Sequence, residues 1–306
     1  MELSSNVKER FCKDCNIPLK LFQEPYFTDR LKLYDPYYNT LKKWELFIKE
    51  LAGYHCEQDY FEEYNRVKDT AIREIQAAEG YKNFNAEDMN QYRVTHNNLP
   101  GKDIFKTSND GKCFVSLDMM KANFSALRHY DSSIFHYEDT WESFIGRYTQ
   151  NQHMIRSKYI RQVILGNCNP KRHITYEKYL MDMILTLLEE KGLPLEKVVF
   201  FSNDEIVIEI PDLEREFLTT LTEQAASQMP VPVRVELFTL HKIKGTDGYY
   251  KEISQKDQAP KIDFKCLDNY MLPFVLRHFL GEEITENDKV FCYEGRLAKF
   301  IEIPVL

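Results

Sequence analysis

Two short apolar stretches, each bearing acidic residues, constrain the fold of this chain more than any other feature. The first, Phe114–Arg128, begins with an apolar run that delivers Asp118 and continues at once as a helix-like segment. The second, Val198–Ile210, is typical of a hairpin in which Asp204 and Glu205 precede an alternating apolar strand. A lone acid after a strand is commonly a helix cap, whereas two such stretches side by side can hold a divalent metal ion. The prediction therefore depends on whether they are neighbours in space.

The order of the remaining segments predicts an α+β chain in three parts. Residues 1–110 are expected to form a mostly helical N-terminal region, because apolar residues recur at helical spacing. Residues 111–250 run strand, helices, hairpin, helix, strand, which predicts an antiparallel sheet with helices. Residues 251–306 begin with a polar connection over 251–261 and form a small C-terminal unit. Turn clusters within 97–111 separate the first part from the second.

Local patterns predict the individual elements. Helices are expected at 41–51, 59–78, 140–166, 176–191, 213–228 and 270–280. Strands are expected at 112–117, in the hairpin, and at 231–240, 290–293 and 300–303. The two acidic stretches thus fall in the middle part, with helices between them.

The composition restricts the compartment and the kinds of partner. A formal net charge of −8 means that any nucleic acid must meet a local basic patch rather than the whole surface. The seven Cys are irregularly spaced, and the CxxC of Cys12 and Cys15 lacks a second ligand pair, which argues against structural zinc. With neither a signal peptide nor a run of about 18 apolar residues, we expect a cytoplasmic protein with reduced thiols and no membrane partner.

A stretch between the two acidic segments is basic and contains no acid. Residues 147–173 have no Asp or Glu, which favours an anion-binding patch, although a solvated helix face remains an alternative. The cations of this stretch are Arg147, Arg156, Lys158, Arg161, Lys171 and Arg172. Neither a P-loop nor a Rossmann glycine motif occurs, so a nucleotide site of those kinds is not expected.

These three stretches together resemble the motifs of family-B-type DNA polymerases. Residues 118–128, DMMKANFSALR, resemble D-F-N-S-L-Y-P-S-I-M-R, sharing the Asp, the Ser seven residues on and the Arg ten residues on. Residues 158–167 fall where that family has its basic helix, K-x-x-x-N-S-x-Y-G, and residues 200–206, FFSNDEI, are similar to Y-G-D-T-D-S-I. The resemblance covers roughly residues 112–245 and implies a palm-like domain with an antiparallel sheet of the RRM or ferredoxin-like kind.

The resemblance implies metal-dependent nucleotidyl transfer to a nucleic-acid 3′ end. Asp118 and Asp204 would ligate two Mg²⁺ or Mn²⁺ ions, with Glu205 auxiliary, because paired carboxylates bridge such ions. The substrates would be an NTP or dNTP and a DNA or RNA primer and template. Six residues are expected to contact the nucleotide, through its triphosphate or its sugar: Asn123, Phe124, Arg156, Lys158, Arg161 and Lys242.

The chain departs from the family pattern at the expected sugar site and in the hairpin. Where the family has a Tyr that excludes a 2′-hydroxyl, this chain has Asn123, which can hydrogen-bond a ribose hydroxyl; Phe124 is an alternative gate. The first Asp of the hairpin motif is replaced by Ser202. These departures imply a divergent, minimal enzyme and leave open the choice of ribo- or deoxyribonucleotide.

Two other function classes fit the same residues. Residues 202–206, SNDEI, are similar to the G-G-D-E-F motif of diguanylate cyclases, although Ser and Asn cannot copy the close backbone approach that its glycines allow. Reverse transcriptases and RNA-dependent RNA polymerases share the palm as well. The alternative to an enzyme is a non-catalytic palm-like subunit of a larger assembly, in which Asp118 is a cap and Asp204 a turn residue. The acidic net charge is compatible with a protein partner.

Overall fold

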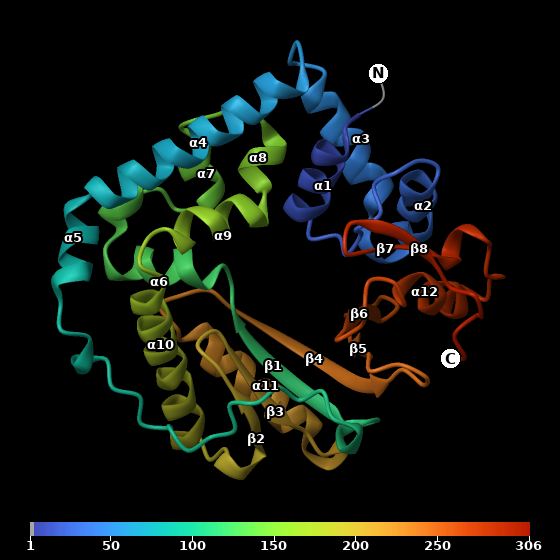
Figure 1. Cartoon of the computed structure of the whole chain (residues 1–306). Helices are drawn as coiled ribbons and strands as arrows, with labels where there is room; N and C mark the ends of the chain where they lie inside the picture. The colour runs from blue at the N-terminus through green and yellow to red at the C-terminus, as the bar shows by residue number, and fades with distance from the viewer. Residues whose placement is uncertain (1–2) are drawn as a thin grey trace.

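A single antiparallel sheet carries both acidic stretches. In the computed structural model, which describes residues 3–306, six strands lie in the order β2-β3-β1-β4-β5-β6 (Figure 1). The strands are β1 (Cys113–Met119), β2 (Val198–Phe201), β3 (Glu205–Glu209), β4 (Val233–Lys242), β5 (Tyr249–Ile253) and β6 (Lys261–Lys265). Each neighbouring pair is antiparallel. The expected α+β class with an antiparallel sheet and helices is therefore confirmed.

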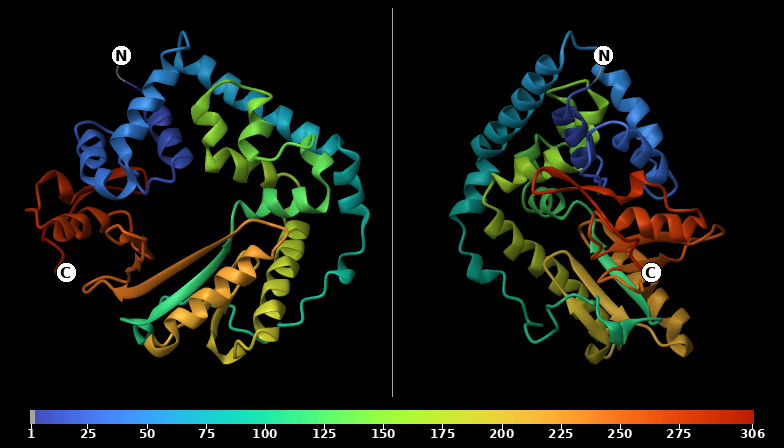
Figure 2. Two further views of the ribbon diagram at one scale, coloured as in Figure 1. Left: turned by 180° about the vertical axis from the view of Figure 1, so that it is seen from behind. Right: turned by 45° about the vertical axis from the view of Figure 1, so that its right-hand side comes forward.

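The two faces of the sheet carry different sets of side chains because side chains alternate along each strand. Leu117 and Met119 of β1 are buried on the face that α10 (Pro170–Glu190) and α11 (Arg215–Ser227) cover (Figure 2). Asp118, between them in the sequence, therefore points to the opposite face. The apolar pattern thus fixes the side on which the acid is presented.

Helices build most of the rest of the molecule. The N-terminal region holds α1 (Ser5–Asp14), α2 (Tyr26–Tyr38), α3 (Thr40–Leu51), α4 (Glu57–Ala77) and α5 (Glu79–Ala86). Between β1 and α10 lie α6 (Ala122–Tyr130), α7 (Trp141–Gly146), α8 (Gln152–Arg156) and α9 (Lys158–Gly166). The prediction of helix throughout 140–166 was wrong in detail, because Asn151 and Ser157 each cap a new helix and so break the segment.

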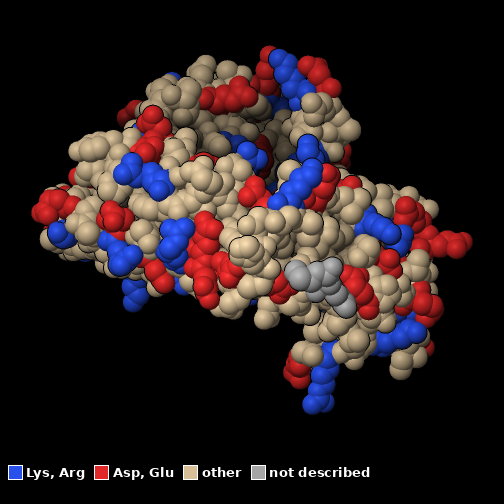
Figure 3. Space-filling model, turned by 90° about the horizontal axis from the view of Figure 1, so that it is seen from above, with Lys and Arg blue, Asp and Glu red and all other residues tan. Residues whose placement is uncertain are grey.

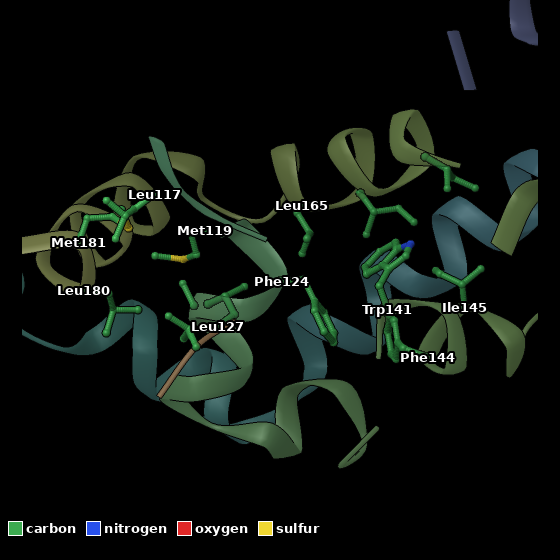
Figure 4. Close-up of a cluster of buried hydrophobic side chains, with 14 of the residues drawn as sticks. Leu117, Met119, Phe124, Leu127, Trp141, Phe144, Ile145, Leu165, Leu180 and Met181 are labelled. Atoms are coloured by element: carbon green, nitrogen blue, oxygen red, sulfur yellow. The ribbon is translucent and has the colours of Figure 1, made fainter. Parts of the chain in front are cut away.

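The main apolar core joins the N-terminal helices to the sheet. It includes buried residues from α1, α4, β1 and α6–α10, among them Phe124, Trp141 and Leu165 (Figure 4). Phe124 packs against the rings of Phe135 and Trp141, with centroids 4.7 and 6.0 Å apart. The core thereby fixes α6 and α9 relative to the end of β1.

The C-terminal unit lies beside the N-terminal helices, so the elements form a ring (Figures 1 and 2). It contains α12 (Leu272–Leu280) and a hairpin of β7 (Val290–Tyr293) and β8 (Arg296–Lys299). Arg30 of α2 donates to Asp288 through Nη1 at 2.6 Å, and both side chains are buried. This ion pair joins the two ends of the chain.

Two expectations for this region were wrong. The polar connection predicted at 251–261 contains part of β5 and the first residue of β6, and the boundary predicted after residue 250 lies inside β5. Buried and half-buried residues alternate in β5, but the charged Lys251 and Glu252 in its middle hide its strand character in a composition count. The strand expected at 300–303 is absent from the described residues; β8 ends at Lys299 instead.

Two further observations bear on the chemical setting. No helix within residues 3–306 combines the length and the apolar character needed to cross a membrane. All seven cysteines are free thiols.

Candidate functional site

The two acidic stretches meet at one edge of the sheet. The backbone N–H of Met119 donates to the carbonyl of Asp204 at 2.8 Å, and Asp118 lies directly opposite Glu205 across the β1–β3 pair. Asp118 and Asp204 both line a cavity of about 590 Å³. The condition on which the sequence prediction depends, that the stretches are neighbours, is met.

Local backbone chemistry shapes both sides of this junction. Lys121 adopts a left-handed conformation, with φ of 50°, which turns the chain from β1 into α6. In the hairpin, Ser202 Oγ accepts from the backbone N–H groups of Asp204 and Glu205 and lies 3.0 Å from Asp204 Oδ1, to which it donates. The Ser that replaces the first Asp of the polymerase motif therefore supports the turn that presents Asp204.

Negative charge is concentrated around Asp118 and only partly neutralised. Burial raises the pKa of Asp118; Arg234 opposes the shift, and the nearby Glu205 and Asp204 add to it. Arg234, opposite Asp118 on β4, donates from Nη2 to Asp118 Oδ2 at 2.8 Å. Arg234 also pairs with Glu236 through Nε at 3.4 Å, whereas Asp204 has no cationic partner among the described residues.

Glu205 has different partners from Asp204 although it follows it directly. Its Oε1 accepts from Ser116 Oγ at 2.6 Å and lies 3.5 Å from Lys251 Nζ. Lys251 is itself buried over the ring of Phe238, with its nitrogen 4.3 Å from the centroid. Glu205 lies on the same face of the sheet as Asp118 but does not line the cavity.

Two cations face the acids from α9. Lys158 and Arg161 both line the cavity, and neither forms an ion pair with an acid in the part of the chain that the structure describes. Burial lowers the pKa of Arg161, and its Nε is inaccessible to solvent and lacks a hydrogen-bond acceptor within residues 3–306. The molecule seen from above is hollowed, with basic side chains inside the hollow (Figure 3). Glu142, which pairs with Lys121, opposes the shift of Arg161 but forms no ion pair with it among the described residues, so the burial of the Arg161 guanidinium is only partly offset.

The α10 wall of the cavity adds a buried acid and a buried imidazole. Glu177 accepts from Asn203 Nδ2 at 2.6 Å, and burial raises its pKa to about 7, with Asp204 adding to the shift. His173, one turn earlier, is buried, and burial lowers its pKa to about 4. At neutral pH this wall therefore carries a neutral imidazole and a carboxyl group that is protonated in part.

The structure brings together only some of the expected nucleotide-contacting residues. Asn123 lines the cavity, as do Lys158 and Arg161. Phe124 is instead buried in the core, because consecutive helical residues point to different sides. Arg156 is exposed on α8 and does not line the cavity.

Lys242 is remote from the acids. Arg234, opposite Asp118, lies near the start of β4, whereas Lys242 ends the strand, roughly 26 Å farther along at the usual rise per residue. Its nitrogen lies over the Tyr249 ring, 4.4 Å from the centroid. The expectation that Lys242 contacts the same ligand as Asp118 does not agree with this placement.

Four ionisable residues that line the cavity were missed by the sequence reasoning: Lys121, Arg234, Glu177 and His173. Arg234 could be found only from the β1–β4 register, which no local pattern reveals. Glu177 and His173 occupy one face of α10 at helical spacing, and this spacing is a signal once that helix is known to face the hairpin.

The donor set around the cavity is not a preformed metal cluster. Within the described residues no three acidic, His or Cys side chains are grouped so that they could hold a metal ion.

No protein-family model matches the chain, and no curated protein matches it. The chemistry of the cavity must therefore be argued from its own residues.

Proposed function

We propose that the chain is a metal-dependent nucleotidyltransferase that adds nucleotides to a nucleic-acid 3′ end at the cavity between β1, the β2–β3 hairpin and α9. The observation that carries the proposal is the lining of a single cavity: Asp118 and Asp204 on the strand side, and on the helix side Lys158 and Arg161, which pair with no acid among the described residues. Two-metal transfer requires acids and cations on opposite sides of a triphosphate.

The residues present fit a hard divalent cation. Asp118 and Asp204 offer carboxylate oxygens, the ligand type that Mg²⁺ and Mn²⁺ prefer. Burial is the main cause of the raised pKa of Asp118, and the nearby Glu205 and Asp204 add to it; a bound cation would favour the ionised carboxylate. Bound there, the ion would lower the pKa of an attacking hydroxyl and neutralise charge on the phosphates. Arg234 holds one oxygen of Asp118 and leaves the other available.

The helix side fits the phosphates of a nucleoside triphosphate. Lys158 and Arg161 lie three positions apart on α9, so their side chains lie on one face of the helix. A bound triphosphate would bring negative charge to the Arg161 guanidinium, which lines the cavity and has no ion-pair partner among the described residues. These side chains would hold the triphosphate and orient its α-phosphorus toward the acids.

The connectivity of the sheet supports the palm comparison. Strand β1, helices, the β2–β3 hairpin, α11 and β4 follow one another in the chain, and the strands lie in the order β2-β3-β1-β4. This is the ferredoxin-like arrangement, with both acids at the same edge. β5 and β6 extend it by two strands.

Asn123 is the residue we assign to the sugar. It lines the cavity, and its Oδ1 accepts from the N–H of Phe124 at 3.0 Å, which leaves its NH₂ group free to donate to a ribose hydroxyl. Phe124 cannot act as the gate from its place in the core. We infer a preference for ribonucleotides.

Substituting the two acids tests the proposal. We expect Asp118→Asn and Asp204→Asn each to reduce Mg²⁺-dependent or Mn²⁺-dependent nucleotide incorporation at least about 100-fold, because each removes a charged metal ligand. Primer extension on DNA and RNA measures the rate, and circular dichroism checks the fold. Glu209→Gln, at the far end of β3 and paired with Lys112 at 3.0 Å, is the matched control and should retain activity. Undiminished incorporation by either Asp variant would reject the site.

One observation favours a second candidate, a non-catalytic nucleotide-binding subunit. Arg234 already neutralises part of Asp118, as expected if the acid has become a structural ion-pair partner. A wild-type chain that binds triphosphate without a divalent metal and incorporates no nucleotide would support this alternative.

A further inference from the structure

A buried acid at the end of α1 makes contact with the helix that carries the cavity cations. Asp14 is the last residue of α1, and its side chain is fully buried. Its Oδ1 accepts from Ser157 Oγ at 2.7 Å and from Tyr64 OH at 3.3 Å, and its Oδ2 lies 3.0 Å from His153 Nε2. Three separate segments therefore converge on one carboxylate.

The position of Asp14 is unfavourable for the stability of α1 alone. An acid in the last turn of a helix faces the negative end of the helix dipole. A buried carboxylate also loses its hydration and is tolerated only when it is well hydrogen-bonded. The three partners supply those hydrogen bonds, so the role of Asp14 lies in what it holds rather than in its own helix.

What Asp14 holds is the start of α9. Ser157 is the N-cap of α9, and its Oγ accepts from the N–H of Ile160 at 3.0 Å while donating to Asp14. Lys158 follows directly, and Arg161 lies one turn later. The direction of the Ser157 hydroxyl is thus fixed from one side by the helix and from the other by α1.

A second contact joins the same two helices. The Arg10 guanidinium of α1 lies over the ring of Tyr159 on α9, 5.0 Å from its centroid, and over the ring of Tyr64, 4.6 Å from its centroid. The contact is a cation–π interaction, which is directional enough to restrict rotation of α9 about its axis. Arg10 and Asp14 lie one turn apart on the same face of α1.

We propose that Asp14 is a positioning residue for triphosphate binding: by holding the Ser157 cap, it orients Lys158 and Arg161 toward the cavity. The N-terminal region is then part of the site rather than only a scaffold. This inference rests on the proposed function, because it assigns the ligand of α9 to the triphosphate of a nucleotide.

Binding of inorganic tripolyphosphate and hydrogen exchange of α9 amides test the inference. We expect Asp14→Asn and Ser157→Ala to weaken tripolyphosphate binding about five- to tenfold and to speed exchange within 158–166. Ser157→Thr keeps the hydroxyl and should restore both values. Thr140→Ala, which removes the N-cap of α7, is the matched control, because α7 contributes no residue to the cavity.

Measurements at a temperature where every variant is folded, verified by circular dichroism, separate a positioning role from loss of stability. If the wild type binds tripolyphosphate and Asp14→Asn and Ser157→Ala bind it with the same affinity, the positioning role is overturned and the proposed function is left intact. If Thr140→Ala weakens tripolyphosphate binding as much as they do, the positioning role is also overturned, because the loss of any helix cap would then be enough to weaken binding. A wild-type chain that does not bind tripolyphosphate would overturn the proposed function and this role together.

Discussion

The molecule contains two clusters of charged side chains that differ in how deeply they are buried and in how completely they are paired. The first cluster surrounds Asp288 and joins the N-terminal helices to the C-terminal unit; we call it the clasp. Asp288 accepts from Arg30 through Oδ1 and from Arg277 and Thr285 through Oδ2. Arg30 also donates to three backbone carbonyls of residues 287–290. At the cavity, by contrast, Arg161 Nε and Lys158 lack acidic partners among the described residues.

The comparison separates a structural cluster from a ligand site. Evolution of a stable fold tends to satisfy buried polar groups, because each unsatisfied group costs free energy. In the clasp, protein groups alone pair with the charged side chains. In the cavity, the charged side chains are fully paired only when an anion and a cation bind. The predictions that follow either sharpen or remove this difference.

The largest expected effect is on stability at the clasp. Asp288→Ala leaves Arg30 buried without its acid and should lower the free energy of unfolding by about 3–5 kcal/mol. Urea denaturation measures the loss. Glu45→Ala, which removes an exposed pair with Lys49, should cause no measurable change. A clasp variant as stable as wild type would mean that pairing is not what makes this cluster structural.

The next largest effect concerns Glu177 and pH. Burial raises the pKa of Glu177 in the folded state to about 7, so the folded state favours the protonated carboxyl group. The contribution of Glu177 to the free energy of unfolding is therefore full below about pH 4.5 and is lost as the pH rises through about 7. The side chain of Glu177→Gln does not titrate, so the free energy of unfolding of this variant should fall less steeply with pH than that of the wild type. The two pH profiles should differ by up to about 3 kcal/mol. Denaturant midpoints from pH 4.5 to 8 measure it. Parallel pH profiles for the two proteins would contradict the assignment.

A smaller effect is expected in binding at α9. Arg161→Met keeps the apolar part of the side chain but removes the guanidinium, and should weaken nucleoside triphosphate binding about 10- to 100-fold. Calorimetric titration measures the affinity. Arg156→Met, on the exposed surface of the neighbouring α8, should leave it unchanged. An equal loss in both variants would indicate a diffuse electrostatic effect instead of a defined site.

Local sequence patterns predicted much of the fold. The stripe of Tyr60, Tyr64, Val67, Ala71 and Ile75 in α4 is buried as expected, because helical spacing places these residues on one face. β5 was missed because Lys251 and Glu252 interrupt its apolar residues, although Lys251 is buried in the fold. The breaks that divide 140–166 into three helices depend on capping hydrogen bonds, which an apolar count does not register.

The candidate site was predictable where it depended on strand ends and unpredictable where it depended on register or tertiary packing. The sequence reasoning expected Asp118 and Asp204 to be neighbours because both were assigned to strand ends. Arg234 reaches Asp118 only through the pairing of two strands far apart in the sequence. Asp14 likewise looks like a surface acid at a helix end until α8 and α9 pack onto it.

The most direct test of the central claim is a thermal shift measured with Mn²⁺ and a non-hydrolysable nucleoside triphosphate together. At ligand about 100-fold above Kd, the wild-type Tm should rise by about 4–5 °C. The Asp118→Asn/Asp204→Asn double variant and Arg161→Met should each lose most of that rise, since acids and cations contribute to one site. Equal shifts in all three proteins, or no shift in wild type, would contradict the account.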